Sequence, residues 1–348
     1  MLSKIDNSGK VRFMQNPFKN MKNPFKNMKN PLKKLSDKQK GKLKVALAYF
    51  ITLSVCLLFF GLAGKYIINK FVDKKVNDSD IVQVIGDLPT EDDRNTILYL
   101  QVDNQNNLTN GLIVRNLPDM GEINIVPVTP YMTSQVGESD SKKTLIEIYN
   151  ETKPSNATGA VENVTKAVEN AFDIKIDKYM TVSNSGFDTM INYFGGVSYM
   201  ITENIFYSDP VTGEEISIEK GNNVILTNQQ VRLFLNYPLF ENGRAENLKI
   251  ASDIMTRFLN GGFLQVDMLE SNIDNIFNSF YSDATTNISK SEYLQYKGEI
   301  IYVTKNYSNF VESRTPVGAW SQDGKTFELN KGFREEINNF FELTKTPK

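Results

Sequence analysis

The feature that most constrains this chain is an uncharged apolar run at residues 45–64, VALAYFITLSVCLLFFGLAG. About 20 such residues in a helix span the ~30 Å hydrocarbon core of a bilayer. A signal peptide has a shorter apolar region of roughly 7–15 residues and ends in small residues, which Lys65-Tyr66-Ile67-Ile68 does not provide. A buried helix of a globular domain is the alternative, but such helices usually keep a polar edge. We therefore predict one transmembrane helix over residues 44–66.

The charges on either side of this run predict its orientation. Residues 1–44 contain 13 Lys and Arg but only 2 Asp and Glu, whereas the whole chain has a net charge of −2. Basic flanking segments stay in the cytoplasm during membrane insertion. We expect a single-pass protein of the cell membrane, with a cytoplasmic tail at residues 1–43, a stalk at 67–94 and an extracellular domain at 95–345.

The basic tail contains a repeat, because NPFKNMK at residues 16–22 recurs at 23–29. Each copy carries a proline, which breaks helices, so we expect a disordered tail. The alternative is that Phe18, Phe25 and the lysines dock on anionic lipid headgroups of the inner leaflet.

Two features of the composition restrict the chemistry of the extracellular part. The chain has no His, and its single Cys, Cys56, lies within the apolar run. This excludes Ser-His-Asp hydrolysis, an intrachain disulfide and structural zinc. Carboxylates, Arg, Lys, Tyr, Ser, Thr and a hard cation such as Mg²⁺ remain.

Short β-rich runs alternate with helical runs after Thr96, which predicts an α/β domain with a sheet covered on both faces. The expected strands are 97–102, 112–114, 123–128, 179–182 and 197–202. The first expected helix covers 159–172, and the second is capped by Ser185 and ends at Gly195-Gly196. The third runs from the Thr227 capping box to Asn236, and the fourth covers 245–259 with Gly261-Gly262 after it.

Several motifs occur in an order that resembles a known family. Ile174–Tyr179 fits "I-x-I-D-x-Y", Gly195–Val197 fits "G-G-V", Leu226–Phe234 fits "L-N-G-x-x-A-L-x-Y", and Glu241–Arg244 fits "D-x-G-R". The set covers roughly residues 95–345 and is similar to the LytR-CpsA-Psr family of cell-envelope proteins. The N-terminal anchor fits this family as well.

The resemblance implies a three-layer α/β/α sandwich with a mixed central sheet and an apolar tunnel for a lipid. Members of the family move a glycopolymer from a polyprenyl-diphosphate carrier to peptidoglycan outside the membrane, in the envelope of Gram-positive bacteria. Their arginines grip the diphosphate and their acidic residues hold Mg²⁺. Such a reaction suits bidentate guanidinium donors and a divalent ion, because both neutralise leaving-group charge.

The sequence departs from the family pattern where this chemistry is carried. The family's "R-[ST]-D" falls on Leu108–Asn110, its "I-P-R-D" on Val128–Tyr131 and its "Y-x-R-x-R" on Leu235–Pro238. Of the "D-x-G-R-x-x-R-Q" segment only Arg244 remains, and the second arginine falls on Asn247. Losing several arginine–phosphate contacts should abolish ordinary diphosphate catalysis.

The resemblance therefore predicts a site with fewer charged residues than the family pattern has. Arg244 and Asp103 are the catalytic candidates, and Asp103 with Glu241 could hold Mg²⁺. Candidates for gripping the lipid diphosphate are Arg244, Arg115, Arg232 and Lys249. The alternative for Arg115 is a mid-strand position, and for Arg232 the solvent face of its helix.

Three functions follow. The first is a degenerate family member that binds a polyprenyl-linked glycopolymer, peptidoglycan or envelope-assembly proteins. A filled or collapsed tunnel would remove the lipid-based forms of this function and of the next. The second is an active Mg²⁺-dependent phosphotransferase that attaches glycopolymers to peptidoglycan, which release of polyprenyl phosphate would reveal. The third, a transcriptional regulator, is disfavoured because the domain is expected outside the cell and no helix-turn-helix is visible; we expect no nucleic acid partner.

Overall fold

The computed structural model describes residues 4–5, 11–12, 88–137, 141–208 and 213–342. The chain divides into two units, residues 1–75 and 76–348. In the first unit, β1 (Lys4–Ile5) and β2 (Val11–Arg12) pair antiparallel, a pairing that the sequence did not suggest.

The predicted transmembrane helix at 44–66 and the NPFKNMK repeat lie outside the described residues. The stalk lies outside them up to residue 87. Within the described residues, no helix combines the length and the apolar character that crossing a membrane requires. The anchor therefore stays a prediction.

The second unit is built on a mixed sheet of five strands in the order β13-β5-β4-β3-β8. The strands are β3 (Asn95–Val102), β4 (Leu108–Leu117), β5 (Glu122–Val128), β8 (Lys178–Ser183) and β13 (Val311–Ser313). The central pairs β3–β4 and β4–β5 are antiparallel, whereas β3–β8 and β5–β13 are parallel. The predicted mixed central sheet is confirmed.

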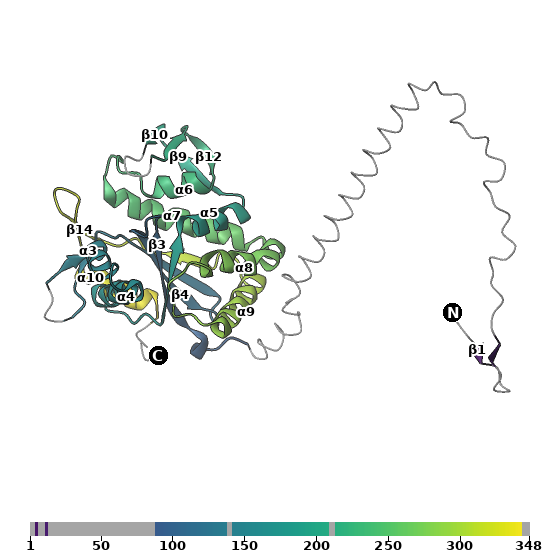
Figure 1. Ribbon diagram of the computed structural model, residues 1–348. Coiled ribbons are helices and arrows are strands. Elements are labelled where there is room, and N and C mark those ends of the chain that lie inside the picture. The colour runs from purple at the N-terminus through teal and green to yellow at the C-terminus, as the bar shows by residue number, and fades with distance from the viewer. Residues whose placement is uncertain (1–3, 6–10, 13–87, 138–140, 209–212, 343–348) are drawn as a thin grey trace, which may run out of the picture. The chain divides into compact units, whose positions relative to one another are not determined.

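Alternate residues of the strands face two separate cores, as the period of a β-strand requires. Leu98 and Leu100 belong to one core, together with residues of α3 (Leu145–Thr152), α4 (Ala157–Phe172) and α10 (Lys331–Phe340). Ile97 and Tyr99 belong to the other core, with α5 (Asn184–Tyr193), α7 (Arg244–Phe263), α8 (Val266–Tyr281) and α9 (Lys290–Asn306). Helices thus cover both faces of the sheet (Figure 1).

Small two-stranded sheets complete the second unit. β9 (Val197–Ile201) pairs with β12 (Gly221–Leu226), β10 (Ile205–Ser208) with β11 (Glu215–Ile218), β6 (Thr133–Ser134) with β7 (Lys143–Thr144), and β14 (Gly318–Trp320) with β15 (Phe327–Leu329). Helix α6 (Asn228–Leu235) packs beside β9, with Phe234 edge-on to Tyr199 at 5.9 Å between ring centres. The β9–β12 and β10–β11 pairs stand above α6 at the top of Figure 1.

The ends of two helices differ from the prediction. Ser183, not Ser185, caps α5, because its hydroxyl accepts a hydrogen bond from the Gly186 amide at 3.1 Å. Helix α7 continues through Gly261 and Gly262 to Phe263, although glycine pairs often end helices. A Cβ on Gly262 would lie 2.9 Å from the Phe194 ring, so this glycine permits close helix packing instead.

Candidate functional site

A cavity of about 280 Å³ lies between the sheet and the helices of one face. It is lined by the same face of β3, β4, β5 and β8 and by α5, α7, α8 and α9. The cavity extends from the carboxyl end of β3, near Gln101, toward the carboxyl end of β4, near Asn116. The resemblance implied an apolar tunnel, and this cavity is the candidate for it.

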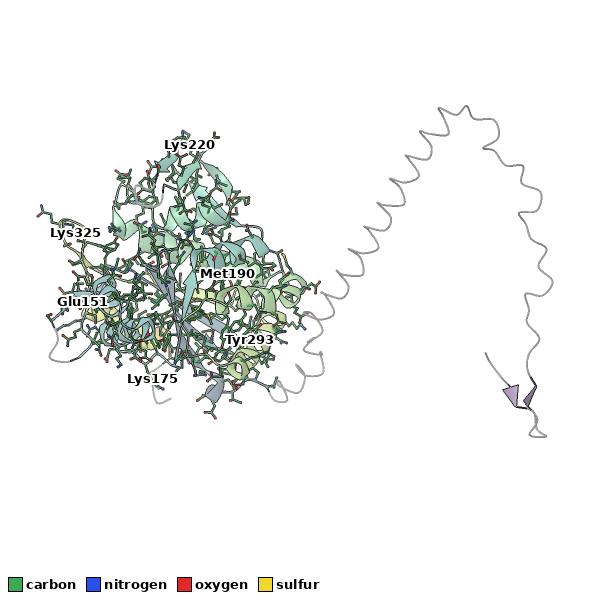
Figure 2. The ribbon with its side chains drawn as sticks, viewed as in Figure 1. Glu151, Lys175, Met190, Lys220, Tyr293 and Lys325 are labelled. Carbon is green, nitrogen blue, oxygen red and sulfur yellow. The ribbon has the colours of Figure 1, made fainter. Side chains whose placement is uncertain are left out.

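Most of the cavity wall is apolar. Met190 on α5 and Tyr293 on α9 mark two of its helices in Figure 2. The wall includes Ile97, Tyr99, Leu112, Val114, Met180 and Val182 from the sheet and Phe187, Phe194, Ala251, Met255, Leu259, Phe263, Leu269, Ile273, Ile276, Phe277 and Phe280 from the helices. Burial raises the pKa of the Tyr99 hydroxyl to about 12, which keeps it neutral. The interior therefore suits a hydrocarbon chain.

One end of the cavity is polar, and we call it the polar end. It consists of Gln101, Thr109, Asn110, Thr129, Tyr131, Asn236, Arg244 and Asn247. These residues meet because β3 and β5 end here, β4 begins here, and the α6–α7 connection packs against them. Asn236 is exposed, so the polar end reaches the protein surface.

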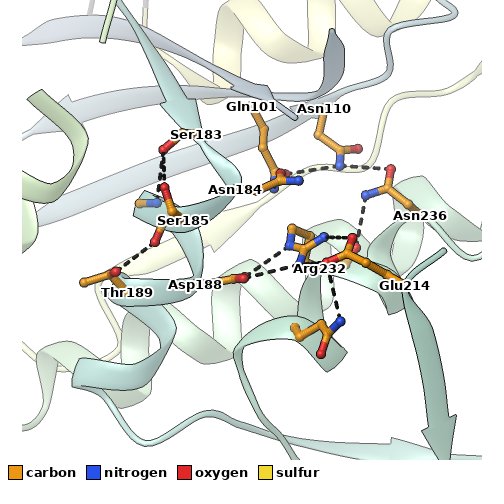
Figure 3. A network of polar contacts seen from close by, with 12 residues as sticks. Gln101, Asn110, Ser183, Asn184, Ser185, Asp188, Thr189, Glu214, Arg232 and Asn236 are labelled. Carbon is orange, nitrogen blue, oxygen red and sulfur yellow. Dashed lines mark hydrogen bonds and ion pairs between the residues drawn. The ribbon is translucent and has the colours of Figure 1, made fainter. Parts of the chain in front are cut away.

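Side-chain amides are linked into a chain at this end (Figure 3). Gln101, 7% exposed, donates to Asn184 Oδ1 at 3.1 Å and accepts from Asn110 Nδ2 at 3.3 Å. Asn110 Nδ2 also donates to Asn236 Oδ1 at 3.1 Å, and Asn236 Nδ2 donates to the Arg232 carbonyl at 3.0 Å. The network holds β3, β4, α5 and α6 together without using a charge.

Arg232 is buried, 6% exposed, and does not lie on the solvent face of α6 as one reading of the sequence placed it. Its guanidinium binds both oxygens of Glu214 at 2.7 Å and both oxygens of Asp188 at 3.2 and 3.3 Å. The hydrogen bonds that it donates to Glu214 raise its pKa, burial lowers it, and the hydrogen bonds to Asp188 raise it further. Arg232 thus forms ion pairs with two carboxylates of this chain, and it does not line the cavity.

Arg244 lines the polar end, at the first position of α7. Its guanidinium carbon lies 3.9 Å from the centre of the Tyr131 ring. Among the described residues, no hydrogen bond or ion pair engages this guanidinium. A guanidinium that lies over an aromatic face can still donate its N–H groups to a ligand.

Arg115 lies within β4, two residues before its end, and so inside a strand as the alternative interpretation expected. It faces the side of the sheet opposite the cavity, where its Nη1 donates to Thr96 Oγ1 at 3.2 Å. Burial lowers the pKa of this guanidinium. The structure therefore separates Arg115 from Arg244 by the thickness of the sheet.

The predicted acidic ligands are not gathered around the cavity. Asp103 closes its own loop, because its carboxylate accepts from the amides of Gln105 and Asn107 at 2.8 Å and from Asn107 Nδ2 at 3.0 Å. Glu241 and Lys249 are exposed, and none of the three lines the cavity. Nowhere in the described ranges do three or more acidic residues cluster as metal ligands would. The structure therefore does not bring Asp103 and Glu241 to the cavity wall, and the Mg²⁺ site stays a prediction.

A second charged residue, Lys297, lines the cavity away from the polar end. Its ammonium binds both oxygens of Asp274 at 2.8 and 2.9 Å, and the Tyr293 hydroxyl donates to the same carboxylate at 2.5 Å. This contact ties α8 to α9 and neutralises the ammonium.

The sequence identified Arg244 but did not single out the amides around it. Asn110, Tyr131, Asn236 and Asn247 fall on the motif segments that lack the family's arginines and acids. The available signal was that two of the replacements, Asn110 and Asn247, are polar and uncharged.

Comparisons with known proteins agree with this architecture. A model of the LytR_cpsA_psr family matches residues 73–330. No curated protein sequence matches the chain. Among solved structures, a Eubacterium siraeum protein described as a proposed transcription regulator has a TM-score of 0.59 at 18% identity, over 75% of this chain and 95% of that one.

Two further structures have the same fold. B. subtilis TagV has a TM-score of 0.55 at 17% identity, over 72% of this chain and 98% of that one. TagT bound to LIIa-WTA has a TM-score of 0.52 at 14% identity, over 74% of this chain and 96% of that one.

Proposed function

The chain belongs to the LytR-CpsA-Psr family, and from this membership we propose that it is a cell-envelope protein that holds the lipid chain of a lipid-linked glycopolymer without transferring the polymer. The observation that carries the proposal is the apolar cavity that ends at Arg244. Each CH₂ group that leaves water for such a wall contributes about 0.8 kcal/mol, so even a short prenyl segment would be held.

The polar end argues against transfer. Phosphoryl transfer requires groups that stabilise charge as it develops on the leaving phosphate, typically several cations and a metal ion. Arg244 is the only charged side chain among the residues of the polar end. Asp103 and Glu241, the candidate metal ligands, do not line the cavity. The cavity thus supports binding of the lipid, and the residues of the polar end do not support transfer of the polymer.

The choice of ligand class also draws on a relative. TagT, which shares the fold, has been solved bound to LIIa-WTA, a wall teichoic acid intermediate. We propose the same general class for this chain, a glycopolymer or its lipid-linked precursor. A membrane helix at residues 44–66 with a cytoplasmic N-terminus would keep the cavity at the outer leaflet, where such lipids are presented.

Filling the cavity tests the proposal. Ala251 on α7 lines the wall, whereas Ala245 on the same helix is exposed. In the full-length chain, Ala251→Phe should abolish binding of a fluorescent prenyl-linked glycan, and Ala245→Phe should not. Met190→Trp, on α5, fills the cavity from another side. Binding that survives both filling variants in folded protein would refute the proposal.

An active phosphotransferase remains the second candidate because the Arg244 guanidinium makes no hydrogen bond or ion pair with the described residues and could bind a phosphate. The purified full-length chain would then release polyprenyl phosphate from a lipid-diphosphate-linked glycan in the presence of Mg²⁺. Release that is unchanged by Arg244→Ala would exclude this site.

A further inference from the structure

We propose that the polar end selects a head group with a single negative charge next to hydroxyl groups, as in a sugar joined to the lipid by one phosphodiester, in preference to a diphosphate. This inference rests on the proposed function, since it assumes that a lipid chain occupies the cavity. It concerns the head group of the lipid, because the apolar wall contacts only the hydrocarbon chain and cannot select between head groups.

The first observation is the charge of the cavity lining. Among the described residues that line the cavity, none is Asp or Glu, and the charged ones are Arg244 and Lys297. Lys297 lies away from the polar end and is neutralised by Asp274. One guanidinium therefore faces the head group, and it matches one phosphodiester charge.

The second observation is the cluster behind the polar end. Arg232 carries one positive charge, and Asp188 and Glu214 carry two negative charges, so the cluster has an excess of one negative charge. Asn236 links it to the polar end through the Arg232 carbonyl. A second phosphate would lose water without gaining a cation, because Arg232 is already bound by two carboxylates.

The third observation is the orientation of two amides. Asn247 donates both of its side-chain N–H groups, to the carbonyls of Leu235 and Tyr237 at 2.9 Å each. Asn110 Nδ2 donates to Gln101 and Asn236. The Oδ1 atoms of Asn110 and Asn247 accept no hydrogen bond from the described residues. They can accept from hydroxyl groups but repel phosphate oxygens.

Together these residues offer one cation and fixed neutral acceptors. A sugar presents hydroxyl donors for the acceptors, and a single phosphodiester presents the one anion that Arg244 can pair. A diphosphate presents two charges and fewer donors within the same reach. The complementarity thus favours the monophosphodiester.

The test uses the full-length chain and three probes with the same farnesyl chain and the same sugar. The linkages are a phosphodiester, a diphosphodiester and a neutral glycosidic bond, and affinity is measured with and without MgCl₂. We expect the phosphodiester to bind about tenfold or more tightly than the diphosphodiester, independently of Mg²⁺.

Arg244→Met should weaken binding of the phosphodiester about tenfold and leave the neutral glycoside unchanged. Arg257→Met is the matched control, because Arg257 is an exposed arginine on the same helix that does not line the cavity. It should change none of the three affinities.

The outcomes separate the two proposals. Equal or tighter binding of the diphosphodiester by the unaltered chain overturns the head-group inference and leaves the proposed function standing. So does phosphodiester binding that is unaffected by Arg244→Met. If none of the probes binds, the proposed function fails, and the inference fails with it.

Discussion

The guanidinium of Arg244 stacks on the ring of Tyr131, with 3.9 Å between the guanidinium carbon and the ring centre. The two residues come from different parts of the chain, one from the loop after β5 and the other from the start of α7. A cation over an aromatic face is stabilised by about 0.5–2 kcal/mol. The ring thus holds in place the one guanidinium of the polar end.

Tyr131→Leu removes this platform. The arginine would then sample other rotamers, so affinity for a phosphodiester-linked prenyl glycan should fall by roughly 2- to 30-fold, which corresponds to the same range of stacking energy. Tyr131→Phe keeps the ring and should bind like the unaltered chain. A loss as large with Phe as with Leu would assign the effect to the hydroxyl group.

Asn110→Arg adds a second guanidinium to the polar end. The extra charge should offset the second charge of a diphosphate, so the preference for the phosphodiester should shrink by about tenfold or more. Asn222→Arg adds the same charge at an exposed position of β12 and should leave the preference unchanged. Competition between the two probes measures the ratio directly. If Asn110→Arg kept the full preference for the phosphodiester, the number of positive charges at the polar end would not determine which head group binds.

Glu299 predicts a pH dependence of stability. It is 8% exposed on α9, and burial raises its pKa from 4.5 to about 7, against a hydrogen bond from Gln295 that lowers it. A carboxyl with a raised pKa binds its proton more tightly in the folded state, so stability falls as pH rises from 4.5 through 7. Above pH 7 the cost approaches roughly 3 kcal/mol.

Glu299→Gln should therefore be more stable than the unaltered chain at pH 8, and the difference should vanish near pH 4.5. Urea unfolding of the full-length chain across this range measures it. Glu292→Gln should have the opposite sign at pH 8, because hydrogen bonds from Lys178 and Ser289 lower the pKa of Glu292 to about 2. Parallel pH profiles for Glu299→Gln and the unaltered chain would contradict the assignment.

Two adjacent glycines of α7 should respond differently to alanine. A Cβ on Gly261 meets no atom within 4 Å, so Gly261→Ala should stabilise the helix by up to about 1 kcal/mol. A Cβ on Gly262 would lie 2.9 Å from the Phe194 ring, so Gly262→Ala should lose this gain or destabilise the protein. Melting temperatures of the two variants give the comparison. Equal gains at both positions would show that Phe194 moves freely.

Much of the sheet could be predicted because its strands are marked by their residues. Ile97–Val102 and Ile123–Val128 are dense in β-branched and apolar residues and appear as β3 and β5 with small changes at the ends. β4 is longer than expected, because Asn110 and Gly111 near its start are poor strand formers that the β3 pairing holds extended.

Helix α9 was not predicted, and its burial explains why. It buries Lys297 and Glu299 at positions where a core-facing helix normally carries apolar residues. The apolar spacing that identifies a helix from sequence is therefore blurred. The ion pair with Asp274 that makes this burial tolerable joins residues 23 positions apart on two helices.

Part of the candidate site could be predicted, and part depends on contacts between distant segments. Arg244 stood out because it is the arginine that remains of its motif. The burial of Arg232 could not be predicted, because its partners Asp188 and Glu214 lie 44 and 18 residues earlier in the chain. The assignments of Asp103 and Glu241 as metal ligands stay predictions, which the positions of their side chains do not support.

The side-chain amides at the polar end have a consequence for the conditions under which it can work. Carboxamides do not titrate. Hydrogen bonding by Asn110 and Asn247 should therefore be the same at acidic pH as at neutral pH. In a site built from carboxylates and a metal ion, acid would protonate the carboxylates and polyanions would compete for the metal. The polar end contains no carboxylate, so its amides are not affected by either process.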